Sequence, residues 1–139
     1  MINPEIPLAR ARACQFVKQY FKYFNDSRKE DYLPKMYRPY SVVVWCGNPV
    51  SINQNGLQAF FRALSVAEAT VVTWDAQPLK GIDAAAPSEN LPIIVTVSGL
   101  MSRGPSEERN FHQTFVLAPD FENQDSPLYY ISCDLFRYT

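Results

Sequence analysis

Helical periodicity dominates the N-terminal part of the chain. From Leu8 to Phe24, apolar residues recur every three or four positions and form two stripes along one predicted helix. One stripe holds Cys14, Val17, Phe21 and Phe24, and the other holds Phe16, Tyr20 and Tyr23. A helix that lies across a sheet can bury more than half of its circumference, so we expect both stripes to face the core. The pattern therefore predicts one long, largely buried N-terminal helix.

Two shorter helices are predicted on either side of a first strand. Residues 25–27 (Asn-Asp-Ser) stop the long helix and cap a short one from Arg28 to Leu33, which Pro34 ends. The β-branched and aromatic run from Tyr40 to Trp45 is typical of a strand, and turn chemistry follows it. Gly56 then leads a third helix. Its apolar positions are Leu57, Phe60, Phe61 and Leu64.

The remaining chain alternates with the period of two that marks strands. Four runs show it: Thr70 to Gln77, Ile93 to Met101, Arg109 to Leu117, and Tyr129 to Tyr138. The links between them are too short for crossover helices, so we expect an antiparallel meander. Helices first and strands afterwards is the order of an α+β fold, with helices on one face of a curved sheet. The 139 residues are expected to form a single domain, 1–139.

The alternation also divides the predicted sheet into two faces of different composition. The aromatic-rich set, expected to face the helices, is Ile93, Val95, Val97, Phe111, Gln113, Phe115, Leu117, Tyr130, Ser132, Asp134, Phe136 and Tyr138. The opposite set is Ile94, Thr96, Ser98, Leu100, Asn110, His112, Thr114, Val116, Ile131, Cys133, Leu135 and Arg137. Arg137 is nearly the only charged residue of this set, which is unusual for a sheet face in contact with water. The apolar patch that these residues would form is larger than is normal on a monomer. We therefore expect this face to dock onto another protein.

Composition narrows the classes of partner and cofactor. The formal net charge is −1, with 13 basic and 14 acidic residues, which argues against autonomous binding of DNA or RNA. Cys14, Cys46 and Cys133 with the lone His112 supply no zinc ligand set, so no metal or other cofactor is expected. The N-terminus lacks the features of a secretory signal, and no apolar stretch is long enough to span a membrane. These features favour an intracellular soluble protein with reduced thiols and no membrane partner.

Four motifs follow one another in an order that matches a known family. They are Trp45-Cys46-Gly47-Asn48 with Gly56 and Phe60-Phe61, then Asp75-Ala76-Gln77-Pro78, then Phe111 to Leu117, and finally Asp134-Leu135-Phe136-Arg137. Together they resemble the nuclear transport factor 2 family, and the resemblance runs from about Ala13 to Tyr138. It implies a cone-shaped α+β fold: a bent antiparallel sheet wrapped around a long N-terminal helix, with two shorter helices and a pocket at the open end.

Within that family the chain looks most like the small, non-catalytic subunit of the heterodimeric mRNA export receptor. The segments Trp45 to Ser51 and Ser132 to Tyr138 carry this likeness. In that branch the outer sheet face packs on the related domain of a large subunit, and an Arg in the last strand pairs with an Asp of that partner. Arg137 occupies the matching position, and the alternation independently places it on the outer face. The nominated partner-binding residues are Arg137, Leu135, Thr114, His112, Thr96, Ile94, Cys133 and Val116.

The resemblance also implies how such a pair works. The heterodimer contacts RNA and the Phe-Gly repeats of nucleoporins, and it shuttles between the nucleus, the nuclear pore and the cytoplasm. The near-neutral charge of this chain is consistent with a subunit that meets RNA only as half of a pair. No catalytic residue is nominated.

Two other classes of the family remain as alternatives. The homodimeric import carrier for GDP-bound Ran carries a Glu where this chain has Cys46, and Asp residues near Gly104 and Ser106. Isomerases and dehydratases of the same cone fold use pocket carboxylates, for which Asp75, Asp134 and Tyr130 are the candidates. No acid–base pair is identifiable among them, so an enzyme is not expected.

Overall fold

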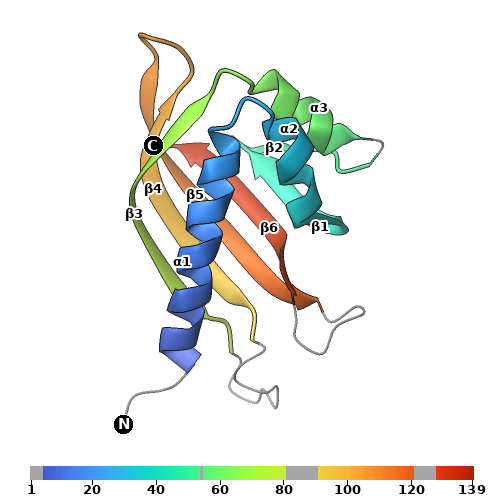
Figure 1. Cartoon of the computed structure of the whole chain (residues 1–139), viewed down its shortest axis with the longest axis vertical. Coiled ribbons are helices and arrows are strands. Elements are labelled where there is room, and N and C mark those ends of the chain that lie inside the picture. The colour runs from blue at the N-terminus through green and yellow to red at the C-terminus, as the bar shows by residue number, and fades with distance from the viewer. Residues whose placement is uncertain (1–4, 54, 81–90, 121–127) are drawn as a thin grey trace.

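A long helix lies across one face of a bent sheet, and two shorter helices cover one end of it (Figure 1). The computed structural model describes residues 5–53, 55–80, 91–120 and 128–139. The helices are α1 (Glu5–Phe24), α2 (Lys29–Tyr32), the 3₁₀ helix η1 (Leu33–Met36) and α3 (Gly56–Ala63). The strands are β1 (Tyr37–Trp45), β2 (Asn48–Pro49), β3 (Glu68–Pro78), β4 (Ile93–Ser102), β5 (Glu108–Asp120) and β6 (Leu128–Tyr138). The expected α+β fold is confirmed.

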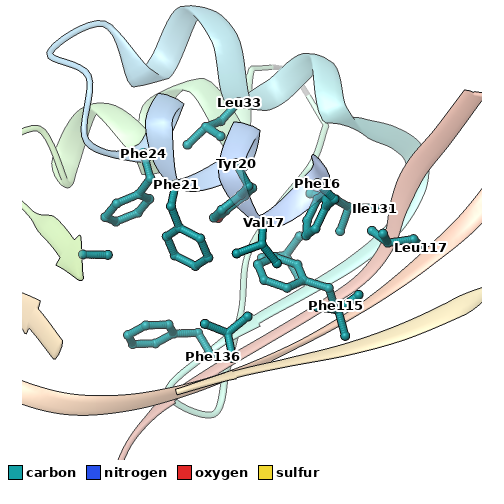
Figure 2. Packing of buried hydrophobic residues seen from close by; sticks show 14 of the residues in the cluster. Phe16, Val17, Tyr20, Phe21, Phe24, Leu33, Phe115, Leu117, Ile131 and Phe136 are labelled. Atoms are coloured by element: carbon teal, nitrogen blue, oxygen red, sulfur yellow. The ribbon is translucent and has the colours of Figure 1, made fainter. Parts of the chain in front are cut away.

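Both apolar stripes of α1 reach the core, as the sequence predicts. The buried residues of α1 include Ala9, Ala13, Phe16, Val17, Tyr20, Phe21 and Phe24. Figure 2 shows Phe16, Tyr20 and Phe21 gathered above Phe115 of β5. The ring centroids of Phe16 and Tyr20 lie 4.9 and 4.8 Å from that of Phe115, in edge-to-face arrangements that aromatic pairs prefer. Cys14 and Tyr23, at the margins of the stripes, are only half-buried.

The sheet is mixed, whereas the sequence predicts an antiparallel one. Its strand order is β2-β1-β6-β5-β4-β3, and β3 to β6 form the expected antiparallel meander. β1, however, pairs parallel to β6, with Val44 opposite Leu135 and Trp45 opposite Phe136. A parallel neighbour needs a long connection, which α3 and the whole meander supply. Because the two strands are far apart in sequence, their local patterns could not reveal the pairing.

A bulge near the start of β6 corrects one prediction about the faces. Val116 pairs with Cys133, but the next residue, Leu117, pairs with Ile131, so Ser132 is the extra residue. The bulge shifts the alternation by one position. Ile131, predicted to face outward, is therefore fully buried beside α1, whereas Tyr130 moves from the predicted inner set to a half-buried position. From Cys133 onward the predicted alternation holds.

The segment after α1 is anchored by contacts that differ from the predicted cap. Arg28 precedes α2 and makes no capping bond through its side chain, although Asp26 Oδ1 accepts its backbone N–H at 2.8 Å. The ammonium of Lys29 is buried and donates to the carbonyls of Leu64 and Ala67, both at 2.7 Å. These bonds tie α2 to the end of α3. Burial lowers the pKa of Lys29 to about 8.

Candidate docking face

Side chains of four neighbouring strands line up in rows on the face of the sheet away from α1. The strand registers place Ile94, Val116, Cys133 and Val42 in one row, and Thr96, Thr114, Leu135 and Val44 in the next. Ser98, His112 and Arg137 form a third row. The outer face is defined below as these three rows together with Tyr40. All eight nominated partner-binding residues belong to it, so the structure brings them together as the alternation implies.

The outer face is open to solvent and mostly uncharged. Leu135 is 42% exposed, Val42 54% and Tyr40 66%, which are high values for large apolar side chains of a sheet. The neighbouring Thr96, Thr114 and Val116 are half-buried by the strands beside them. Aliphatic and threonine side chains in rows offer water few hydrogen bonds, and the helices lie on the other face of the sheet. The isolated chain therefore exposes a contiguous apolar surface.

A hollow interrupts the outer face where β1, β5 and β6 meet. Its volume is about 470 Å³, and its walls include Val44, Thr114, Leu135 and Arg137. Gly47, at the turn after β1, lies at its edge and has a φ of 83°, a left-handed conformation that favours glycine. The hollow is large enough to receive a side chain of a partner.

Arg137 and His112 supply the polar chemistry of the outer face. They lie directly opposite each other on β5 and β6, and His112 Nδ1 is 3.1 Å from Ser98 Oγ. The Arg137 side chain is exposed and makes no ion pair with any described residue. A guanidinium without an ion-pair partner, surrounded by apolar side chains, can form an ion pair with a carboxylate of another protein.

The buried face of the same strands holds a polar cluster around Asp134. The Asp134 carboxylate is buried in the core, where Oδ2 accepts from the Tyr37 hydroxyl and Oδ1 from Gln113 Nε2, both at 2.7 Å. Burial raises the pKa of Asp134 to about 6, and these two hydrogen bonds oppose the rise. Burial and the Asp134 charge also raise the pKa of Tyr37. Gln113 thus bonds a buried polar group.

The three residues considered as catalytic candidates do not form one site. Asp75 is on the surface, 3.6 Å from Arg10, with both side chains exposed. Tyr130 contacts Tyr40 at the outer side of the sheet, with ring centroids 5.6 Å apart. Asp134 alone is in the core, and both of its oxygens are already hydrogen-bonded. The arrangement brings no two of them together as an acid and a base.

Sequence reasoning missed the contribution of β1 to the outer face. Tyr40, Val42 and Val44 point outward while Val43 is buried, so the strand alternates as the pattern of β-branched residues allows. These three residues join the outer face because β1 pairs parallel to β6, which extends the face by one strand. The sequence alone did not indicate this pairing. Trp45 at the end of β1 lies flat on Phe136, with centroids 3.6 Å apart.

Across residues 5–53, 55–80, 91–120 and 128–139, no three His, Cys, Asp or Glu side chains gather as metal ligands. In the same ranges, no helix combines the length and the apolar content needed to cross a bilayer.

Comparison with known proteins decides the family. A family model of the nuclear transport factor 2 (NTF2) domain matches residues 13–138, nearly the same span as the resemblance in the motifs. The chain belongs to the NTF2 family. Among curated proteins, this NTF2-family chain is 29% identical over 124 residues to NTF2-related export protein 1 of Bos taurus. The alignment covers 89% of the chain and 84% of the relative.

Solved structures agree with the assignment to the NTF2 fold. The structure of NTF2 from Cryptosporidium parvum matches with a TM-score of 0.71 and 25% identity, covering 100% of this chain and 98% of that one. The yeast complex of the deubiquitinase Ubp3 with its cofactor Bre5 matches with a TM-score of 0.68, over 94% of this chain and 96% of that one. At 17% identity, the second likeness concerns the fold alone.

Proposed function

We propose that this chain is the non-catalytic small subunit of a heterodimeric mRNA export receptor. The observation that carries the proposal is the outer face, an exposed apolar surface with one cation, Arg137, that lines the hollow and pairs with no described residue. The likeness to NTF2-related export protein 1 supports a role in nuclear export. The partner is a larger export subunit whose own NTF2-related domain packs against the outer face.

Docking is favourable because the outer face carries apolar side chains that are exposed to water. Exposed Leu135 and Val42 gain roughly 25 cal/mol for each Å² of apolar surface that a partner removes from water. A specific interface covers on the order of 800 Å² per partner, which a sheet face four strands wide can supply. Arg137 gives the interface a fixed orientation, because an ion pair that is partly desolvated costs about 2 to 5 kcal/mol when one side is removed.

The remaining parts of the proposal concern the assembled pair. RNA and the Phe-Gly repeats of nucleoporins are bound by the heterodimer, and the pair shuttles between nucleus, nuclear pore and cytoplasm. A net charge of −1 supports binding of RNA only together with the partner. The filled core supports a non-catalytic role, since the Asp134 carboxylate is enclosed by its own hydrogen-bond donors.

The import-carrier alternative predicts a carboxylate at the turn between β1 and β2. That position holds Cys46, which is exposed and has a φ of 51°. A neutral thiol does not supply the charge that a basic residue of Ran requires. The carrier also has Asp residues at positions that correspond to about Gly104 and Ser106. Glu107 and Glu108 are exposed close to these positions, at the β4–β5 hairpin, but they are shifted from them. The export reading therefore has the stronger support.

Co-purification tests the proposal. The chain is co-expressed with a large export subunit that carries an NTF2-related domain, and the complex is analysed by size-exclusion chromatography with light scattering. We expect a 1:1 complex with the wild type and its loss with Arg137→Glu. Arg103→Glu is the matched control, because Arg103 is exposed at the β4–β5 hairpin, outside the outer face. A stable homodimer that binds GDP-bound Ran, or a complex indifferent to Arg137→Glu, would contradict the proposal.

A further inference from the structure

A second concave surface lies on the helical side of the molecule. It is a cleft of about 550 Å³ between α2, η1, the start of β1 and the N-terminal turn of α3. The volume is within the range of natural ligand sites, about 300 to 1,000 Å³. It shares no residue with the outer face, so the function proposed above makes no use of it.

The uncharged part of the cleft combines apolar walls with unengaged amides. Pro34, Ile52 and Leu57 supply the apolar surface. The side-chain amides of Asn53, Asn55 and Gln58 line the same cleft, and no described residue is hydrogen-bonded to them. A carboxamide presents one acceptor and two donors, the complement of a peptide group. An extended peptide would therefore find both main-chain partners and an apolar contact here.

The charges around the cleft are mostly neutralised within the chain. Arg38 Nε is 2.9 Å from Asp120 Oδ2, and Asp31 Oδ2 accepts from Arg28 Nε at 3.0 Å. Lys35 is exposed, so water satisfies its ammonium. These groups leave little demand for a charged ligand.

Glu30 is the exception. One of its carboxylate oxygens, Oε2, is covered by protein and has no hydrogen-bond partner among the described residues. The buried ammonium of Lys29 acts on this carboxylate at a distance, but its hydrogen bonds go to Leu64 and Ala67. A covered acceptor without a donor is destabilising, and more so when it is charged. A rotation of the Glu30 carboxylate would present this oxygen to a donor in the cleft.

We propose that this cleft binds an extended segment of a protein partner in which a cationic side chain stands beside an aliphatic one. The cation pairs with Glu30, the aliphatic side chain contacts Ile52 and Pro34, and the amides of Asn53 and Gln58 bind the peptide main chain. An acidic segment is disfavoured, because it would place another carboxylate against Glu30.

The test begins with a random heptapeptide library displayed on phage and selected on the full chain. Enriched sequences should share Lys or Arg next to Leu, Ile or Val. One enriched peptide containing Arg is then synthesised with a fluorescent label, together with a twin in which citrulline, the neutral isostere, replaces that Arg. Fluorescence anisotropy should show that the wild type prefers the Arg peptide by about tenfold or more.

Substitutions then assign the preference to Glu30. Glu30→Gln should bind the two peptides equally, whereas Glu107→Gln, the same change at an exposed hairpin, should keep the wild-type preference. Ile52→Ala should weaken both peptides to a similar degree, which provides a second reading should Glu30→Gln fold poorly. Enrichment of sequences without a cation, or a preference retained in Glu30→Gln, would overturn the proposal. Binding lost in Arg137→Glu would overturn it too, because the peptides would then occupy the outer face.

Discussion

The two faces of the central sheet are built from the same strands, but one face is buried under α1 and the other is open to solvent. On β5, Phe115 has no exposed surface and touches three rings of α1, whereas its chain neighbour Thr114 points into the open hollow of the outer face. Both faces avoid charge, but only one has a helix over it. A low-charge sheet face that no helix covers therefore marks an unfilled interface rather than a second core.

The difference separates folding from association. Side chains of the inner face lose their solvent exposure when the chain folds, so their substitution changes the free energy of unfolding. Side chains of the outer face keep much of their exposure, as Leu135 and Val42 show, so their substitution should change binding instead. Variants one residue apart on the same strand can therefore separate an effect on folding from an effect on binding.

The largest effect is expected for Phe115→Ala. Removal of a ring that packs against Phe16 and Tyr20 leaves a cavity in the core and should lower the free energy of unfolding by about 3 to 5 kcal/mol. Urea denaturation followed by circular dichroism measures the change. Thr114→Ala, the control on the opposite face, should stay within about 0.5 kcal/mol of the wild type. Equal losses in the two variants would show that the outer face is already part of the folding core.

The buried carboxyl of the inner face should make stability depend on pH. Because burial raises the pKa of Asp134 from 3.8 to about 6, the folded state holds a proton more tightly than the unfolded chain in this window. Its contribution to stability is fully present below the unfolded pKa and is lost as pH rises through the folded one. The two pKa values correspond to about 3 kcal/mol.

Asp134→Asn isolates this contribution from those of the other carboxylates. The free energy of unfolding of the variant, relative to the wild type, should rise by about 2 kcal/mol between pH 4 and 7, measured by urea denaturation at each pH. Asp75→Asn, at an exposed ion pair, is the control and should follow the wild-type profile. A constant difference between Asp134→Asn and wild type would contradict the account of the buried cluster.

The smallest effect on folding is expected for Leu135→Ala on the outer face. The side chain is 42% exposed, so the isolated chain should lose no more than about 0.5 kcal/mol of stability. Affinity for the large subunit should fall by about fivefold to tenfold, because apolar burial at the interface is lost. Isothermal titration calorimetry and urea denaturation measure the two quantities. Val66→Ala, an exposed apolar residue between α3 and β3, should change neither one.

Local patterns predicted most of the fold and most of the outer face. The α1 stripes, α3, the meander and the faces of β4 and β5 follow from periodicity, because each depends on residues near one another in sequence. The nominated docking residues followed from the alternation along β4, β5 and β6, and the family resemblance added independent support for Arg137. The predicted family is confirmed by the match over residues 13–138.

What could not be predicted depends on contacts between distant segments. The parallel pairing of β1 with β6 joins Val44 to Leu135, and no local pattern records it. The bulge at Ser132 sends Ile131 into the core, although strict alternation places it outside. The sequence around Lys29 is that of an ordinary surface lysine. In the fold, however, Lys29 is buried, and its ammonium donates hydrogen bonds to the carbonyls of Leu64 and Ala67.

Hydroxyl-radical footprinting of the chain, free and in complex with the large subunit, tests the central claim most directly. It reports the solvent exposure of individual aliphatic side chains, and the chain offers matched probes inside and outside the outer face. Leu135 and Val42 should react severalfold more slowly in the complex, while Val66, 73% exposed and off the sheet face, should react at the same rate in both. Unchanged modification of Leu135 and Val42 in a stable complex would contradict the assignment of the outer face as the interface.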